Sequence, residues 1–91
     1  MKWLEIIELR SGNSDLESQL EKIVNEVEDE INKQAIKAYS RVQIDTDFSI
    51  HLFHDSEKVE NSGSQLGLRL ASALKEFGMV NHSIWIEMQS K

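Results

Sequence analysis

The chain has 91 residues and no cysteine, and its 16 acidic residues outnumber 10 basic ones to give a formal net charge of −6. This length suits one domain with a single hydrophobic core, so we expect one domain over residues 1–91. The composition excludes disulfides, thiol nucleophiles and cysteine metal sites, and the negative charge disfavours binding to nucleic acid or to an anionic membrane.

The N-terminal residues do not have the pattern of a signal peptide. Glu5 places a carboxylate before any apolar run can form, and every uncharged stretch is far shorter than a membrane span. We therefore expect a soluble cytoplasmic protein.

The first predicted strand covers residues 3–10 and has apolar side chains on both faces. One face would carry Trp3, Glu5, Ile7 and Leu9, and the other Leu4, Ile6, Glu8 and Arg10. The register of this strand, and so the face that the helices cover, stays open.

A helix is predicted after the turn at residues 11–13. Ser14 and Glu17 fit a capping box, and residues 32–34 end the helix. Apolar residues follow at helical spacing, namely Leu16, Leu20, Ile23, Val24, Val27 and Ile31. We interpret the acidic residues between them as a solvated face, with a docking face for a basic partner as the alternative.

A β-hairpin is predicted next, because two alternating runs flank a short polar turn. The first run covers residues 35–44 and the turn covers residues 45–47. The side chains expected to pack on the helices are Ile36, Ala38, Val42, Phe48, Ile50 and Leu52.

Residues 55–63 form a polar connection that we expect to be mobile. It would serve either as a lid over a pocket near His54 and Trp3 or as a solvated linker. Ser62 with Gln65 fits a second capping box, and Gly78 would end the second helix as its C′ residue. The buried stripe of that helix would be Leu66, Leu70, Leu74 and Phe77.

The last predicted strand runs over residues 82–88. Its side chains alternate, so that Ile84, Ile86 and Met88 would pack on the helices while Trp85 points the other way. The element order β-α-β-β-α-β therefore predicts an α+β ferredoxin-like plait. In that fold a four-stranded antiparallel sheet has the strand order four, one, three, two and carries two helices on one face.

The sheet face away from the helices would be too apolar for water alone. It would display the candidate interface or ligand-binding residues Tyr39, Arg41, His51, Phe53 and Trp85. We expect a homodimer that pairs through this face. The alternative is a cofactor-free enzyme or binder of a small aromatic or acidic ligand, with a pocket near His51, and the sequence leaves open whether the protein is an enzyme.

His51 is the best candidate for catalysis, because imidazole can act as a general acid or base near neutral pH. A hydrogen-bonded interface histidine is the alternative. His54 would lie on the opposite strand face and roughly 20 Å from His82, at about 3.3 Å per residue. We therefore predict no metal site and no cofactor.

The segment Gly63-Ser64-Gln65-Leu66-Gly67 enters the second helix, where backbone N–H groups could hold an anion. It matches neither the dinucleotide-binding glycine pattern nor the P-loop. We interpret its glycines as allowing close packing of the helix.

In its element order and aromatic open face, the chain resembles the dimeric α+β barrel group of ferredoxin-like proteins, which includes small monooxygenases of antibiotic biosynthesis. The resemblance implies sheet-to-sheet pairing of two copies and an active site between sheet and helices. It carries over no residue, because neither predicted helix contains the histidines found in some of those oxygenases.

Overall fold

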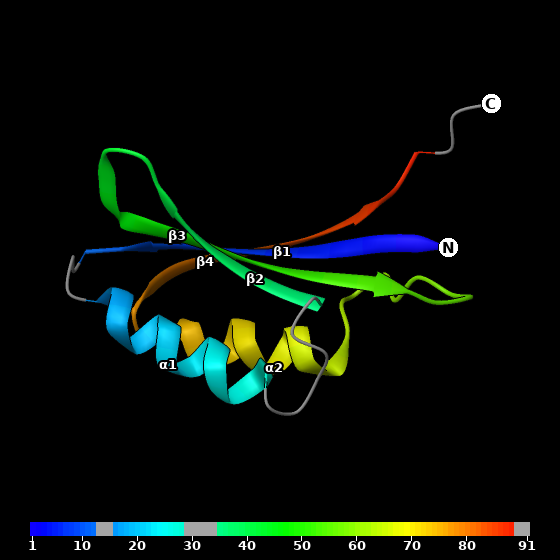
Figure 1. The fold of residues 1–91 in the computed structure, drawn as a ribbon, viewed down its shortest axis with the longest axis horizontal. Helices are drawn as coiled ribbons and strands as arrows, with labels where there is room; N and C mark the ends of the chain where they lie inside the picture. Colours follow the sequence, from blue (N-terminus) through cyan, green and yellow to red (C-terminus); the bar gives the residue numbers. More distant parts are fainter. Residues whose placement is uncertain (13–15, 29–34, 89–91) are drawn as a thin grey trace.

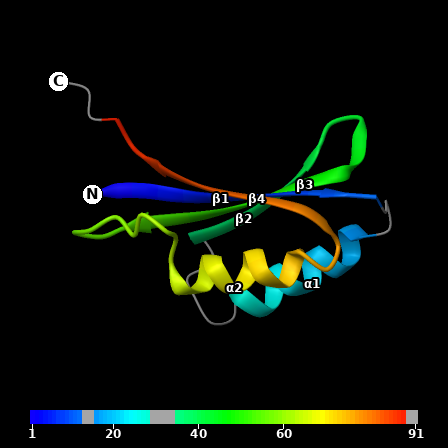
Figure 2. The same cartoon turned by 180° about the vertical axis from the view of Figure 1, so that it is seen from behind.

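The computed structural model describes residues 1–12, 16–28 and 35–88 and has an α+β architecture. Its elements are β1 (Lys2–Ser11), α1 (Glu17–Glu28), β2 (Ile36–Arg41), β3 (Ile44–Asp55), α2 (Gln65–Leu74) and β4 (Gly78–Ile86). The strands form one antiparallel sheet, and both helices lie against the same side of it (Figure 1). Turning the molecule shows that no described helix covers the other side, which we call the open face (Figure 2).

The strand order is β2-β3-β1-β4. Counted from β4, this is the order four, one, three, two that the sequence predicts. β1 pairs antiparallel with both β3 and β4, so the strand nearest the N-terminus lies inside the sheet, while β2 and β4 form its edges.

The structure shows which face of β1 the helices cover, a point that the sequence left open. Trp3, Glu5, Ile7 and Leu9 are buried on the helix side, whereas Leu4 and Ile6 lie partly exposed on the open face. The sheet thus places a carboxylate among apolar core positions.

The hydrophobic core lies between the sheet and the two helices. The predicted stripe of α1 is confirmed for the described residues, with Leu16, Leu20 and Val24 buried; Ser14, Ile31 and the predicted helix end at 32–34 lie outside them. The other core side chains are Ile7, Leu9, Ile36, Phe48, Ile50, Leu52, Leu70, Ala71 and Leu74.

The hairpin turn lies earlier than predicted. β2 ends at Arg41, and Gln43 adopts a positive φ of 66°, a left-handed conformation that reverses the chain in a tight turn. Residues 45–47 therefore belong to β3. The pairing of β2 with β3 also shifts in register after Ser40, which marks a bulge-like irregularity.

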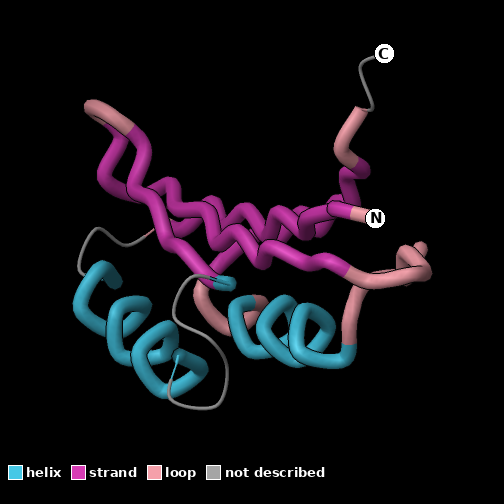
Figure 3. Tube along the Cα trace, turned by 45° about the vertical axis from the view of Figure 1, so that its right-hand side comes forward, coloured by secondary structure: helices cyan, strands magenta, loops and turns pink. Residues whose placement is uncertain are grey.

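The predicted packing of β2 on the helices is wrong for two side chains. Val42 is 84% exposed in the turn, and Ala38 is also exposed, while Ile36 is buried. β2 is an edge strand, and the helices cover only the end at which it begins (Figure 3).

The two ends of α2 also differ from expectation. Its N-cap is Ser64 and not Ser62, since the Ser64 hydroxyl accepts a hydrogen bond from the Gly67 N–H. Its C-cap is Lys75, and Gly78 is the first residue of β4. A Cβ at Gly78 would lie 2.3 Å from the carbonyl oxygen of Arg10, so glycine is needed there for close pairing of β1 with β4.

β4 begins four residues before the predicted start and ends two residues before the predicted end. Ile84 is partly buried, but Ile86 is 53% and Met88 is 90% exposed, so the expectation that both pack on the helices is wrong. The physical reason is visible in Figure 1, where the end of β4 curves away from the helix layer.

Candidate functional site

The open face brings three of the predicted residues together. The ring of His51 lies 4.7 Å from the ring of Tyr39 and 6.2 Å from that of Phe53, and Lys37 Nζ lies 6.0 Å from the Phe53 ring centre. The pairing of β2 with β3 produces this cluster, because Lys37 is opposite His51 and Tyr39 is opposite Ser49.

A groove of about 640 Å³ crosses this face, and Tyr39, Arg41 and His51 help to line it. Phe53 and Trp85 are not among its lining residues. The five predicted residues therefore share one face, but only three of them border the same groove.

Arg41 forms an ion pair with Asp47 in this arrangement. Its Nη1 lies 3.1 Å from Asp47 Oδ2, and Arg10 Nε approaches the same oxygen at 3.7 Å. Asp47 therefore neutralises part of the positive charge of Arg41, one of the residues predicted to lie in an interface or to bind a ligand.

His51 is partly buried in the groove. Burial lowers its pKa from the ordinary value of 6.5, although the nearby Glu8 carboxylate opposes the shift. The neutral imidazole is thus favoured near neutral pH, and its Nε2 lies 3.4 Å from the Ser49 hydroxyl. A neutral imidazole in a groove can accept a proton.

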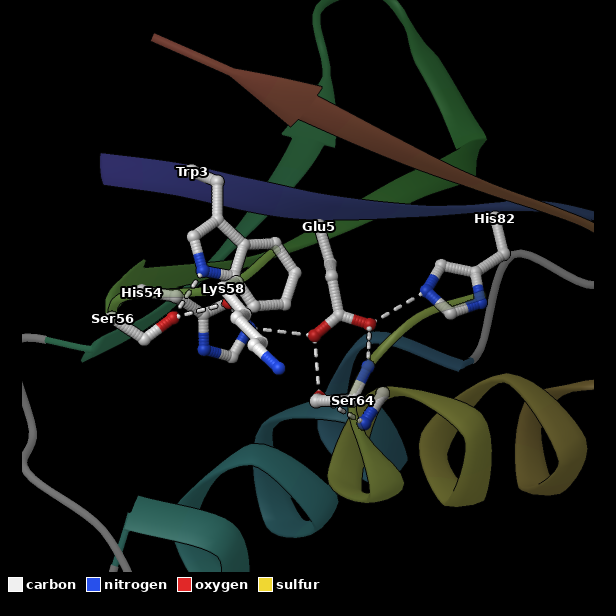
Figure 4. A network of polar contacts seen from close by, with 8 residues as sticks. Trp3, Glu5, His54, Ser56, Lys58, Ser64 and His82 are labelled. Carbon is white, nitrogen blue, oxygen red and sulfur yellow. Dashed lines mark hydrogen bonds and ion pairs between the residues drawn. The ribbon is translucent and has the colours of Figure 1, made fainter. Parts of the chain in front are cut away.

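A second polar cluster, which the sequence analysis missed, lies on the helix side of the sheet (Figure 4). The carboxylate of Glu5 is completely buried. It accepts hydrogen bonds from the Ser64 N–H at 2.9 Å and from the Ser64 hydroxyl, and it contacts His54 Nε2 at 2.6 Å and His82 Nε2 at 2.9 Å. We call Glu5, His54, Ser64 and His82 the carboxylate cluster.

The partners of Glu5 keep it ionised. Burial by itself would raise its pKa, but the hydrogen bonds from Ser64, His54 and His82 outweigh that effect and lower the pKa from its ordinary value of 4.5. An ionised carboxylate offers about four acceptor positions. The four contacts fill them, so the buried charge is fully satisfied.

Two glycines make room for the carboxylate cluster. A Cβ at Gly67 would lie 2.1 Å from Glu5 Oε1, and a Cβ at Gly63 would lie 2.5 Å from the His82 ring. Gly63 also has a positive φ of 99°, which favours glycine. These contacts confirm that the glycines around the start of α2 allow close packing.

The loop after β3 is tied to this cluster through Trp3. The indole stacks on His54 with ring centres 4.0 Å apart, and its Nε1 donates to the Ser56 hydroxyl at 2.8 Å. Ser56 in turn donates to the Lys58 carbonyl oxygen at 2.7 Å. Both the lid function and the mobility of residues 55–63 stay predictions.

The expected separation of His54 and His82 is wrong, because both imidazoles contact the same carboxylate. β3 and β4 flank β1, and side chains from all three strands point toward the helices. The N-terminus of α2 does hold an anion, and that anion is the chain's own Glu5. The available signal was a carboxylate between the apolar positions Trp3 and Ile7.

The geometry of the carboxylate cluster joins β1, β3, β4 and the start of α2 through one charge. Within the described part of the chain, no group of three or more histidine and acidic side chains is arranged to hold a metal ion. The four contacts of Glu5 link the sheet to the start of α2.

Fold and site together define a small α+β domain with a groove on its open face. No family model matches the chain, and the searches of curated proteins and of solved structures found no match. Among residues 1–12, 16–28 and 35–88, no helix has both the length and the apolar character needed to cross a membrane.

Proposed function

We propose that the chain is a self-associating domain that pairs through its open face. The observation that carries the proposal is the apolar surface on this face. Tyr39, Phe53 and Trp85 are 47%, 41% and 56% exposed. They lie on the same side of the sheet as Leu4 and Ile6, which are partly exposed. Aromatic side chains of this kind are enriched in interfaces.

The charges on the open face support a second copy as the partner. Two whole chains repel each other, since each has a net charge of −6. The open-face side chains of the strands are balanced, however, with the cations Lys2, Arg10, Lys37 and Arg41 and the anions Glu8, Asp45, Asp47 and Asp55. Pairing through this face avoids most of the repulsion and allows ion pairs between copies.

We further propose that the fold is a ferredoxin-like plait and that two copies stack sheet on sheet, as in a dimeric α+β barrel. Support comes from the element order and from the strand order counted from β4. Placement of both helices on one side also leaves the other side available (Figure 1).

Replacing Phe53 by glutamate should separate the copies. The substitution would bury a charge without a partner in the interface, so we expect association to weaken at least about tenfold, equivalent to roughly 1.4 kcal/mol. Sedimentation velocity of both proteins over a range of concentrations measures the effect.

Leu68→Glu is the matched control, because Leu68 is 48% exposed but lies on α2, away from the open face. It should associate like the natural chain. A natural chain that sediments as a monomer at high micromolar concentration contradicts the proposal, and so does a Phe53→Glu variant that associates normally.

A second candidate function is binding of a small aromatic or acidic molecule, and the open-face groove is the observation that favours it. His51 would serve as the proton acceptor, and the Tyr39 ring would stack on a flat ligand. Thermal unfolding in the presence of aromatic acids and quinones should reveal a stabilising compound. The stabilising effect of that compound should be lost in Tyr39→Ala and kept in Leu68→Ala. A screen that finds no stabilising compound contradicts the ligand-binding function.

A further inference from the structure

β4 has one free edge along its whole length. It pairs with β1 in unbroken register, from Trp3 opposite Ile86 to Ser11 opposite Gly78. No strand within the described residues pairs with its other side. A free edge of this kind presents unpaired backbone N–H and C=O groups to any extended chain that approaches.

The outward backbone groups can be assigned to particular residues. The Glu87 N–H donates to the Lys2 carbonyl oxygen at 2.9 Å, which continues the ladder between β1 and β4. In an antiparallel pair only every second residue exchanges hydrogen bonds with its neighbour. The alternate residues of β4, which do not hydrogen-bond to β1, direct their N–H and C=O groups to the free edge. In β4 these residues include Val80, His82, Ile84 and Ile86.

The two edges of the sheet differ in how they are protected. Natural edge strands avoid unwanted pairing with charged side chains, prolines or bulges. β2 has Lys37, Arg41 and a register shift. β4 has none of these over nine residues, since its sequence Gly-Met-Val-Asn-His-Ser-Ile-Trp-Ile contains no proline and no ionisable side chain except His82.

We propose that β4 is a second interaction edge, which pairs antiparallel with β4 of another copy of this chain. A two-fold axis at His82 would overlap the strands completely. Met79 would then lie opposite Trp85 of the other copy, and Val80 opposite Ile84. Met79 and Trp85 are 77% and 56% exposed in the single chain, so this register gives both an apolar neighbour.

Edge pairing goes beyond the proposed pairing of open faces, because it uses the backbone groups at the free edge of β4. The Trp85 side chain lies next to both interfaces. It would join two sheets side by side into one continuous sheet, whereas open-face pairing would stack two sheets. The two interfaces can form independently, because the backbone groups of the β4 edge do not take part in stacking.

Hydrogen exchange distinguishes the two interfaces. The amides of Val80, His82, Ile84 and Ile86 should become more protected as the concentration of the chain increases, because pairing hydrogen-bonds them. The alternate amides of Asn81, Ser83 and Trp85 should be protected at every concentration. Unchanged exchange of the four outward amides overturns the proposal, even where sedimentation shows association through the open face.

Proline at position 84 supplies a matched variant. Ile84→Pro removes one outward N–H without removing a hydrogen bond to β1, and Ile84→Ala shortens the side chain but keeps the N–H. In the Phe53→Glu background, Ile84→Pro should weaken the remaining association by tenfold or more relative to Ile84→Ala. Equal association of the two variants contradicts the assignment.

A synthetic peptide with the sequence of residues 78–86 tests the choice of partner. Bound to the free edge, it should protect the four outward amides and reduce the association that remains in Phe53→Glu, while a scrambled peptide should do neither. Protection by both peptides would show pairing without preference for this sequence and would overturn the self-pairing register.

Discussion

Replacing Glu5 by alanine is expected to lower the free energy of unfolding by about 3–5 kcal/mol. The substitution leaves a cavity at a completely buried position and removes the acceptor for His54, His82 and both donors of Ser64. Donors that lose their acceptor inside a fold are costly, and His54, Ser64 and His82 are only partly exposed to water. Urea unfolding followed by circular dichroism measures the change.

Glu8→Ala is the control for this prediction, because Glu8 lies on the same strand but is exposed on the open face. It should change the free energy of unfolding by no more than about 0.5 kcal/mol. A loss for Glu5→Ala as small as that for Glu8→Ala would show that the carboxylate cluster contributes little to stability.

The pH dependence of unfolding checks the same cluster. The pKa of Glu5 is lowered in the folded chain, so its contribution is fully present above the unfolded pKa near 4.5 and is lost as pH falls through the lowered value. Below pH 4.5 the natural chain should therefore lose stability more steeply than Glu5→Ala. Parallel curves for the two proteins would contradict a lowered pKa.

Replacing Gly67 by alanine is expected to destabilise the chain by about 3 kcal/mol, the upper end of the usual cost of overpacking. In an exposed helix this change stabilises by roughly 0.5–1 kcal/mol, because alanine is the better helix former. At Gly67 the new Cβ would lie 2.1 Å from Glu5 Oε1, so it would displace the carboxylate from its donors. Thermal and urea unfolding both measure the result.

Gly12→Ala is the matched control, since a Cβ at Gly12 has no atom within 4 Å. We expect its stability to stay within about 0.5 kcal/mol of that of the natural chain. A Gly67→Ala variant as stable as Gly12→Ala would contradict the tight contact with Glu5. A combined Glu5→Ala and Gly67→Ala variant should recover part of the loss, because the clash is then gone.

Local sequence patterns predict most of the fold. The alternation of Phe48, Ile50 and Leu52 and the helical spacing of Leu16, Leu20 and Val24 correspond to buried side chains. Element ends were less predictable, because they depend on neighbours. The turn at Gln43 contains neither glycine nor proline, so the sequence contains no local signal for it. Gly78 is required by its close contact with the backbone of β1 and does not end α2.

The carboxylate cluster was beyond prediction for a different reason. Period-two alternation places Trp3, Glu5 and Ile7 on one side of a strand, but it does not say which side is buried when both carry apolar residues. Only the tertiary arrangement brings His54 and His82 to Glu5. The residues predicted for the open face were easier to assign, since Tyr39, His51 and Trp85 lie on strands whose other side is clearly apolar.

The carboxylate cluster also has a consequence for the order of events during synthesis. Glu5 finds its partners 49, 59 and 77 positions later in the chain, at His54, Ser64 and His82. Contacts so distant along the chain slow folding, because long loops must close before they form. Until His82 has emerged from the ribosome, Glu5 lacks one of its four contacts. Completion of the fold therefore waits for the last strand, and folding should be close to all-or-none.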